Sequence, residues 1–155
     1  MIKKILKVTY EERHMLIRSS APINEIFEKY KFLKTHNGLI DEFLLCTNKP
    51  NLKYIAMKLL RLTKKYPDRS LEYLLKELPT FLNDTGKFLY NDTENEIPSY
   101  PVIITDNCFY WIRFEDSQYC RTSSLKDSMI SWAISFFVFH IEIPEELSAT
   151  LNYFL

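Results

Sequence analysis

The hydrophobic positions of this chain are most concentrated in its last third, residues 123–155. Ser124 is followed three positions later by Asp127, which is the spacing of a helix-capping pair. The apolar residues after it occupy both sides of a helix and are interrupted at Ser131 and Ser135. A helix that is apolar nearly all round is buried in a protein or in a membrane. Because the run is shorter than the roughly 20 residues of a membrane span, we predict a central helix of a soluble protein. A membrane segment is the second interpretation.

A shorter amphipathic helix is predicted to end the chain. Residues 140–143 break the helical pattern, and Pro144 suits the first position of a new helix because its missing N–H costs nothing there. Leu147, Leu151 and Phe154 then share one face of this helix, which we predict to be buried.

Helical periodicity also runs through the first half of the chain. Thr9 and Glu12 have capping-box spacing and indicate one helix start. Asp68 is expected to cap the last helix of this half, and Pro79 is expected to end it. We predict helices over about residues 10–18, 22–30, 39–44, 52–66 and 69–79, with a turn at 48–51.

Residues 80–99 are polar and acidic, which predicts a mobile connection. Phe88, Leu89 and Tyr90 interrupt this polar stretch. We expect these three side chains to hold its middle against the body of the protein.

After Pro101 the hydrophobic period changes from that of a helix to that of a strand. The pattern predicts strands over residues 102–105, 108–114 and 118–122, joined by turns at 106–107 and 115–117. Three consecutive strands with short turns form an antiparallel meander.

The predicted fold class is therefore α+β. A length of 155 residues favours a single domain, 1–155. It is predicted to contain a helical bundle (1–79), the acidic loop (80–99), and the antiparallel meander with the buried central helix and the C-terminal helix (100–155).

Charge and cysteine content restrict the cellular role. Lys and Arg number 20, as do Asp and Glu, so the formal net charge is zero. A protein dedicated to the nucleic-acid backbone is normally basic, so a nucleic-acid partner is possible but unsupported by charge. An odd number of cysteines (Cys46, Cys108 and Cys120) without an apolar secretory leader favours reduced thiols. We expect an intracellular protein, in cytoplasm or nucleus, without a membrane partner.

Acidic residues at strand ends are the first candidate chemistry. Asp106, Glu115 and Asp116 lie where carboxylates that bind a divalent metal are often found. Turn formation explains the same residues, and it is the interpretation we favour. Alternating carboxylates at positions 92, 94 and 96 resemble part of a calcium loop, but Ile97 stands where the loop needs glycine. We predict no metal and no cofactor.

Thiol and imidazole groups are the second candidate chemistry. Cys108 and Cys120 are expected to face each other across a hairpin, with His140 near them. They lack the close spacing of a zinc site, so buried apolar packing is the favoured interpretation. His14 and His36 are predicted to be isolated surface residues, and no catalytic set can be assembled.

Two small basic clusters are the third candidate. The first contains Lys3, Lys4, Lys7 and Arg13. The second contains Lys64, Lys65 and Arg69. Contact with phosphate and a solvated helix end explain both clusters equally well, and neither cluster has interleaved aromatic residues.

Several stretches of the chain occur in a recognisable order: Ile26–Leu33, Leu39–Phe43, Leu74–Pro79, Pro101–Ile104, Ser124–Ser128 and Phe137–Pro144. This order resembles the C-terminal region of uncharacterised animal proteins related to sterile alpha motif domain-containing protein 3, which are frequent in transposon-rich genomes. The chain departs from that pattern at His140, where Asn is usual, and at Ile143, where Tyr is usual. It contains no sterile alpha motif or zinc-finger module.

The resemblance implies an intracellular module, of mobile-element ancestry, that acts through contacts with other macromolecules. Our first hypothesis is a non-enzymatic protein-interaction module with a protein partner or self-association. Its expected surface is an exposed apolar patch at Leu151, Tyr153 and Phe154 on the final helix. The alternative is a remnant of a transposon-related enzyme or nucleic-acid-binding protein that uses Asp106, Glu115 or Asp116.

Overall fold

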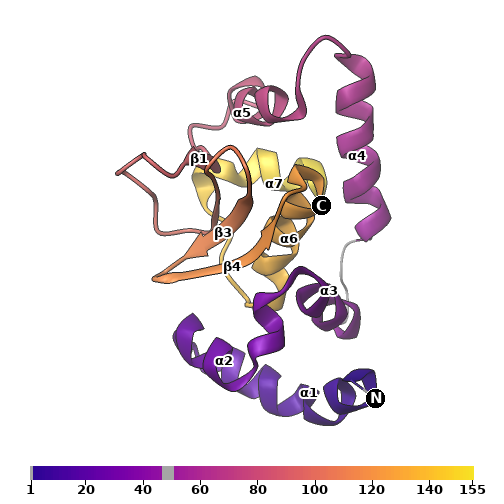
Figure 1. The fold of residues 1–155 in the computed structure, drawn as a ribbon, viewed down its shortest axis with the longest axis vertical. Coiled ribbons are helices and arrows are strands. Elements are labelled where there is room, and N and C mark those ends of the chain that lie inside the picture. Colours follow the sequence, from indigo (N-terminus) through magenta and orange to yellow (C-terminus); the bar gives the residue numbers. More distant parts are fainter. Residues whose placement is uncertain (1, 47–50) are drawn as a thin grey trace.

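A small sheet lies in front of the two C-terminal helices, and the helices of the first half lie below, beside and above them (Figure 1). The computed structural model describes residues 2–46 and 51–155, with side chains from residue 7 onward in the first range. The helices are α1 (Ile2–Arg18), α2 (Ile23–Lys29), η1 (Lys31–Lys34, 3-10), α3 (His36–Leu45), α4 (Leu52–Lys65), α5 (Leu71–Phe81), α6 (Leu125–Val138), η2 (Glu145–Leu147, 3-10) and α7 (Ser148–Phe154). The strands are β1 (Leu89–Asn91), β2 (Val102–Thr105), β3 (Tyr110–Phe114) and β4 (Ser117–Thr122). The predicted α+β class is confirmed.

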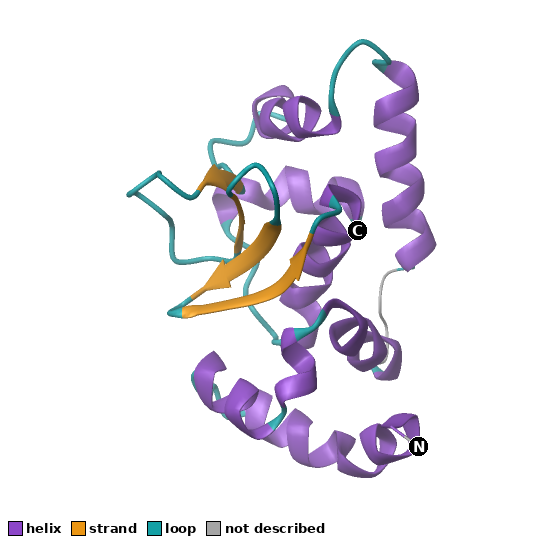
Figure 2. Ribbon diagram, viewed as in Figure 1, coloured by secondary structure: helices purple, strands orange, loops and turns teal. Residues whose placement is uncertain are grey.

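Helix α6 is the centre of the fold, as its pattern predicts. Helix α6 contacts β2, β3 and β4 of the sheet, and it also contacts α3 and α4. Because α6 is covered by several elements, apolar residues are needed nearly all round its surface. Figure 2 shows α6 behind the sheet. Trp132 is fully buried, and its ring stacks on that of Phe88 with centroids 4.5 Å apart. Ser124 caps the helix as predicted, because its Oγ accepts a hydrogen bond from the Asp127 backbone N–H at 3.2 Å.

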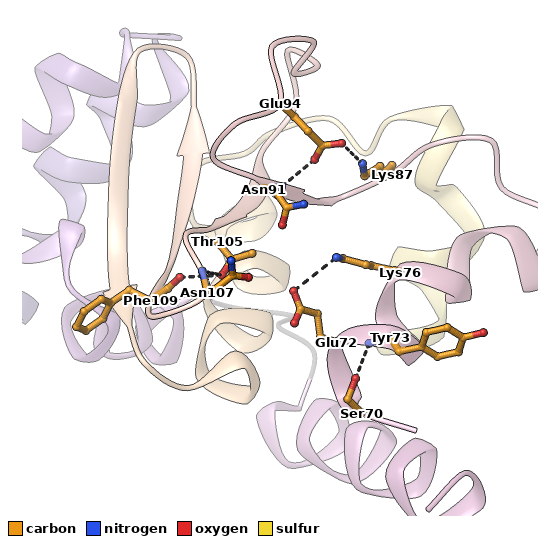
Figure 3. Close-up of polar contacts among 10 residues, drawn as sticks. All are labelled: Ser70, Glu72, Tyr73, Lys76, Lys87, Asn91, Glu94, Thr105, Asn107 and Phe109. Atoms are coloured by element: carbon orange, nitrogen blue, oxygen red, sulfur yellow. Dashed lines mark hydrogen bonds and ion pairs between the residues drawn. The ribbon is translucent and has the colours of Figure 1, made fainter. Parts of the chain in front are cut away.

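The sheet is mixed, which corrects the purely antiparallel prediction. Strands β2, β3 and β4 form the predicted antiparallel meander, but β1 pairs with β2 in parallel, with Leu89 opposite Ile103. This short strand lies inside the acidic stretch, and Phe88, Leu89 and Tyr90 are buried there as predicted. The Glu94 carboxylate also accepts a hydrogen bond from the Asn91 N–H at 2.8 Å and pairs with Lys87 (Figure 3).

Four predicted helix boundaries are wrong. Helix α3 starts at His36, not near residue 39. Helix α1 starts at Ile2, so Thr9 lies in its middle and is no cap. Ser70, not Asp68, caps α5, because the Ser70 Oγ accepts from the Tyr73 N–H at 3.1 Å (Figure 3). Helix α5 runs past Pro79 to Phe81. Pro79 has no N–H and so donates no backbone hydrogen bond. The helix continues past it because the Leu82 N–H still donates to the Leu78 carbonyl at 3.0 Å.

The remaining segments follow the predictions more closely. Most of the predicted turn at 48–51 lies outside the described residues, although Asn51 caps α4 by accepting from the Lys53 N–H at 2.9 Å. Pro144 precedes the short helix η2 rather than opening the last α-helix. Among the described residues, no helix has the length and apolar character required to cross a membrane.

Candidate binding groove

The predicted interaction patch on the last helix is wrong for two of its three residues. Leu151 and Phe154 are both 0% exposed, as is Leu147. They are buried because α7 packs against α4 and α5, which confirms the separate prediction of a buried face. Tyr153 is only partly buried and contributes to the surface described below.

The acidic candidates do not converge. Asp106 precedes β3, whereas Glu115 and Asp116 follow it, so the two groups lie at opposite ends of that strand. The Asp106 carboxylate accepts from the N–H groups of Cys108 (2.9 Å) and Phe109 (2.7 Å), and these bonds lower its pKa. Glu115 accepts from the Ile23 N–H at 3.0 Å. Within the described residues, no group of three or more His, Cys, Asp or Glu side chains is arranged to hold a metal ion.

The histidines are not the isolated surface residues that we predicted. His36 is half-buried, and its Nδ1 lies 2.5 Å from the Ser131 Oγ on α6. The His14 and His140 rings meet edge-on with centroids 5.0 Å apart, which joins α1 to the segment after α6. Both contacts form between segments far apart in sequence, so periodicity alone gives no sign of them.

Cys46, Cys108 and Cys120, which all lie in the described part of the chain, form no disulfide. Cys120 is buried, as the apolar packing interpretation requires, and burial raises the pKa of its thiol to about 12. Cys108 is exposed instead.

A groove of about 560 Å³ lies between α4, α5 and Tyr153 of α7. We call it the α4–α5 groove. Its apolar floor consists of Leu62, Leu74 and Leu78, each less than a tenth exposed. The size is that of pockets that bind small ligands or the side chains of a peptide. Its remaining lining residues are Arg61, Lys65, Tyr66, Arg69, Tyr73, Glu77, Phe81, Leu82 and Tyr153.

Helical spacing explains how the sequence builds this groove. On α5, Leu74 and Leu78 are one turn apart and point to the core, while Tyr73 and Phe81 are two turns apart on the adjacent stripe. That stripe is turned outward, so Phe81 is 73% exposed and Tyr73 is 43% exposed. Figure 3 shows the Tyr73 ring extending away from the Glu72–Lys76 ion pair on the same helix.

The rim of the α4–α5 groove carries positive charge. Arg61 and Lys65 are one turn apart on α4, and Arg69 lies in the connection to α5. The Arg69 guanidinium lies 4.7 Å from the centroid of the Tyr73 ring, and the Lys65 ammonium lies 5.6 Å from that of Tyr66. None of these three cations forms an ion pair with a carboxylate of the described residues. Glu77 is the one carboxylate among the described lining residues.

The second basic cluster lies at the exposed end of α4 and in the connection after it, as predicted, but its surroundings differ from the prediction. Lys65 and Arg69 do have aromatic neighbours, Tyr66 and Tyr73, so the expected absence of interleaved aromatics is wrong. The signal was present in the sequence, because Tyr66 directly follows Lys65. Lys64 lies on the exposed surface of α4 but does not line the groove.

No protein-family model matches the chain, and neither a curated protein nor a solved structure matches it. The fold and the groove define an α+β protein with a basic, aromatic-edged binding groove. The case for a function therefore rests on the contacts and charges of that groove.

Proposed function

We propose that the protein is a non-enzymatic interaction module that binds a partner protein through the α4–α5 groove. The observation that carries this proposal is the exposure of Phe81 (73%) and Tyr73 (43%) beside a leucine floor. Aromatic residues and arginine are enriched at protein interfaces. Large aromatic side chains also dominate the binding energy where they fill a partner's pocket or cover a partner's apolar residue.

A second candidate function is the binding of single-stranded nucleic acid, as expected for a remnant of a mobile-element protein. Three cations and several aromatic side chains in one groove support it, because bases stack on aromatic rings while cations contact phosphates. The zero net charge of the chain weakens it. The acidic residues of the β3 ends lend no support to an enzymatic remnant, since the pKa of Asp106 is lowered rather than raised.

Comparative capture tests the proposal. The immobilised protein, its Phe81→Ser variant and the control variant Phe109→Ser are exposed to the same cell extract, and retained proteins are identified by mass spectrometry. Phe109 is a suitable control because it is 39% exposed and does not line the groove. We expect Phe81→Ser to lose proteins that the wild type and Phe109→Ser both retain.

Retention of the same proteins by all three chains would contradict the proposal. Light scattering on the purified wild type and on Phe81→Ser separates self-association from binding to another protein. A dimer that Phe81→Ser abolishes would assign the groove to a second copy of the chain.

A further inference from the structure

We infer that the occupant of the α4–α5 groove is a short acidic peptide segment that carries one large apolar side chain. The inference rests on the proposed function, because it specifies the partner chemistry of the same groove. It follows from the order of surfaces in the groove, which has an apolar floor, an aromatic edge and a cationic rim.

The floor of the α4–α5 groove determines which kind of partner side chain can be seated in it. Leu62, Leu74 and Leu78 present only hydrocarbon to the groove, so a polar group seated on them would lose its hydrogen bonds to water without replacement. A leucine or phenylalanine side chain has no such hydrogen bond to lose. Phe81 and Tyr153 at the edge are placed to cover such a side chain once it is seated.

The cationic rim of the α4–α5 groove determines the charge of the peptide that fits it. The whole chain is neutral, with 20 basic and 20 acidic residues. The excess of three cations over one carboxylate around the groove is therefore a local asymmetry. Arg61 and Lys65 have no carboxylate partner within the described residues, so they are available to a carboxylate of the partner. Aspartate or glutamate next to the apolar anchor satisfies this arrangement.

A second copy of the chain fits the groove poorly. In a symmetric dimer the same patch meets itself across the two-fold axis. Two such grooves would bring their cationic rims together, because Arg61, Lys65 and Arg69 outnumber Glu77 on each copy. Like charges so placed oppose association.

Nucleic acid also fits less well than an acidic peptide. Lys65 and Arg69 already lie over the rings of Tyr66 and Tyr73, which are the faces on which bases would stack. Glu77 in the groove repels phosphate, and the leucine floor offers nothing to a base edge. A carboxylate beside an apolar side chain makes use of both the cations and the floor.

Peptide display on the purified full chain tests the inference. A library of random short peptides is selected on the wild type, and the affinities of the enriched peptides are measured by fluorescence polarisation. We expect enriched sequences to combine acidic residues with one large apolar residue. Their affinity should fall at least about tenfold with Lys65→Glu and on replacement of their carboxylates by amides. It should also fall on replacement of the apolar anchor by serine.

Lys64→Glu is the matched control, because it makes the same charge change one residue away on α4, outside the groove. Equal losses with Lys64→Glu and Lys65→Glu would overturn the inference, as would enriched peptides that are basic or uncharged. Binding of a single-stranded oligonucleotide in place of the peptides, abolished by Lys65→Glu, would overturn it in favour of nucleic acid. Unchanged melting temperatures of the variants show that folding is not the cause.

The two proposals fail differently. If Phe81→Ser loses captured proteins but no acidic peptide is enriched, the groove is an interaction site and the inferred peptide chemistry is wrong. If Phe81→Ser retains every captured protein and no peptide is enriched, both proposals are wrong.

Discussion

Arg13 of α1 and Glu42 of α3 form a bidentate ion pair in which both residues are only 1% exposed. The Arg13 Nε donates to the Glu42 Oε2, and its Nη2 donates to the Glu42 Oε1 at 3.2 Å. The guanidinium also lies 5.3 Å from the centroid of the Phe32 ring and 5.7 Å from that of Tyr30. Two charges are thus buried at the junction of the N-terminal helices, and each charge stabilises the other.

Removal of either partner should destabilise the protein strongly. We expect Arg13→Met or Glu42→Gln to lower the free energy of unfolding by about 3–5 kcal/mol, because a lone charge or polar group remains buried. The double variant Arg13→Met/Glu42→Leu should recover most of this loss. Urea denaturation of the two single variants and the double variant measures their free energies of unfolding.

The exposed pair Lys29–Glu12 provides the control for this prediction. Its side chains are 54% and 56% exposed, so Lys29→Met should cost less than about 1 kcal/mol. A double variant as unstable as the single variants would show that mutual neutralisation is not what Arg13 and Glu42 contribute.

Trp132→Ala should unfold the protein or nearly so. Trp132 is fully buried, stacks on Phe88, and its Nε1–H donates to the Pro101 carbonyl at 2.7 Å. Loss of a large buried aromatic side chain costs about 3–5 kcal/mol. Trp132→Phe keeps most of the packing and should lose about 1–3 kcal/mol, since it leaves the carbonyl unpaired. A melting temperature unchanged in Trp132→Ala would contradict the central position of α6.

The centre of the fold could be predicted because its physical signal is local. Helix α6 is apolar nearly all round, and a helix of that kind has to be covered on several sides. The bounds of β2, Val102–Thr105, were also predictable from a β-branched run. Strand β1 could not be predicted, because Leu89–Asn91 is short, lies in an acidic stretch and pairs in parallel, not through a tight turn, with the next strand.

Some side chains of the α4–α5 groove could be predicted from the sequence, but the groove itself could not. The leucine stripe of α5, including Leu74 and Leu78, follows from helical spacing. The groove also needs the angle between α4 and α5 and the approach of Tyr153 from α7, and these depend on long-range packing. Helical spacing did predict that Leu151 and Phe154 are buried, and α4 and α5 bury them, so the hypothesis of an exposed patch on the last helix was wrong for these two residues.

Stability should fall as the pH falls from about 7.5 to about 5.5, owing in part to His14 and His36. Burial lowers the pKa of both below the ordinary value of 6.5, helped at His14 by Arg18 and His140 and opposed at His36 by Asp127. Below about pH 6.5 the unfolded chain therefore binds protons that the folded chain does not, and linkage favours unfolding.

The pH dependence can be tested by urea denaturation at both ends of this range. The double variant His14→Gln/His36→Gln should show a smaller loss of stability on acidification than the wild type. A double variant with the same pH slope as the wild type would assign the pH dependence to other groups.

Asp84, in the segment after α5, holds the start of α7 although 64 residues separate it from Ser148. Its carboxylate accepts hydrogen bonds from the N–H groups of Thr150 (2.6 Å) and Ala149 (3.3 Å) and from the Thr150 hydroxyl (2.6 Å). An N-capping carboxylate is usually part of the helix it caps. Here it comes from another segment, so the same contact also fixes α7 against the end of α5.

Asp84→Ala should therefore act on the groove as well as on stability. We expect a loss of about 1–2 kcal/mol from the missing cap, with faster amide hydrogen exchange at Ala149 and Thr150. Because Tyr153 reaches the groove from α7, binding of an acidic peptide should weaken too. Asp92→Ala, at an exposed acidic position in the same 80–99 stretch, is the control and should change neither quantity. Unchanged exchange at both amides in Asp84→Ala would mean that α7 is held by its buried face alone.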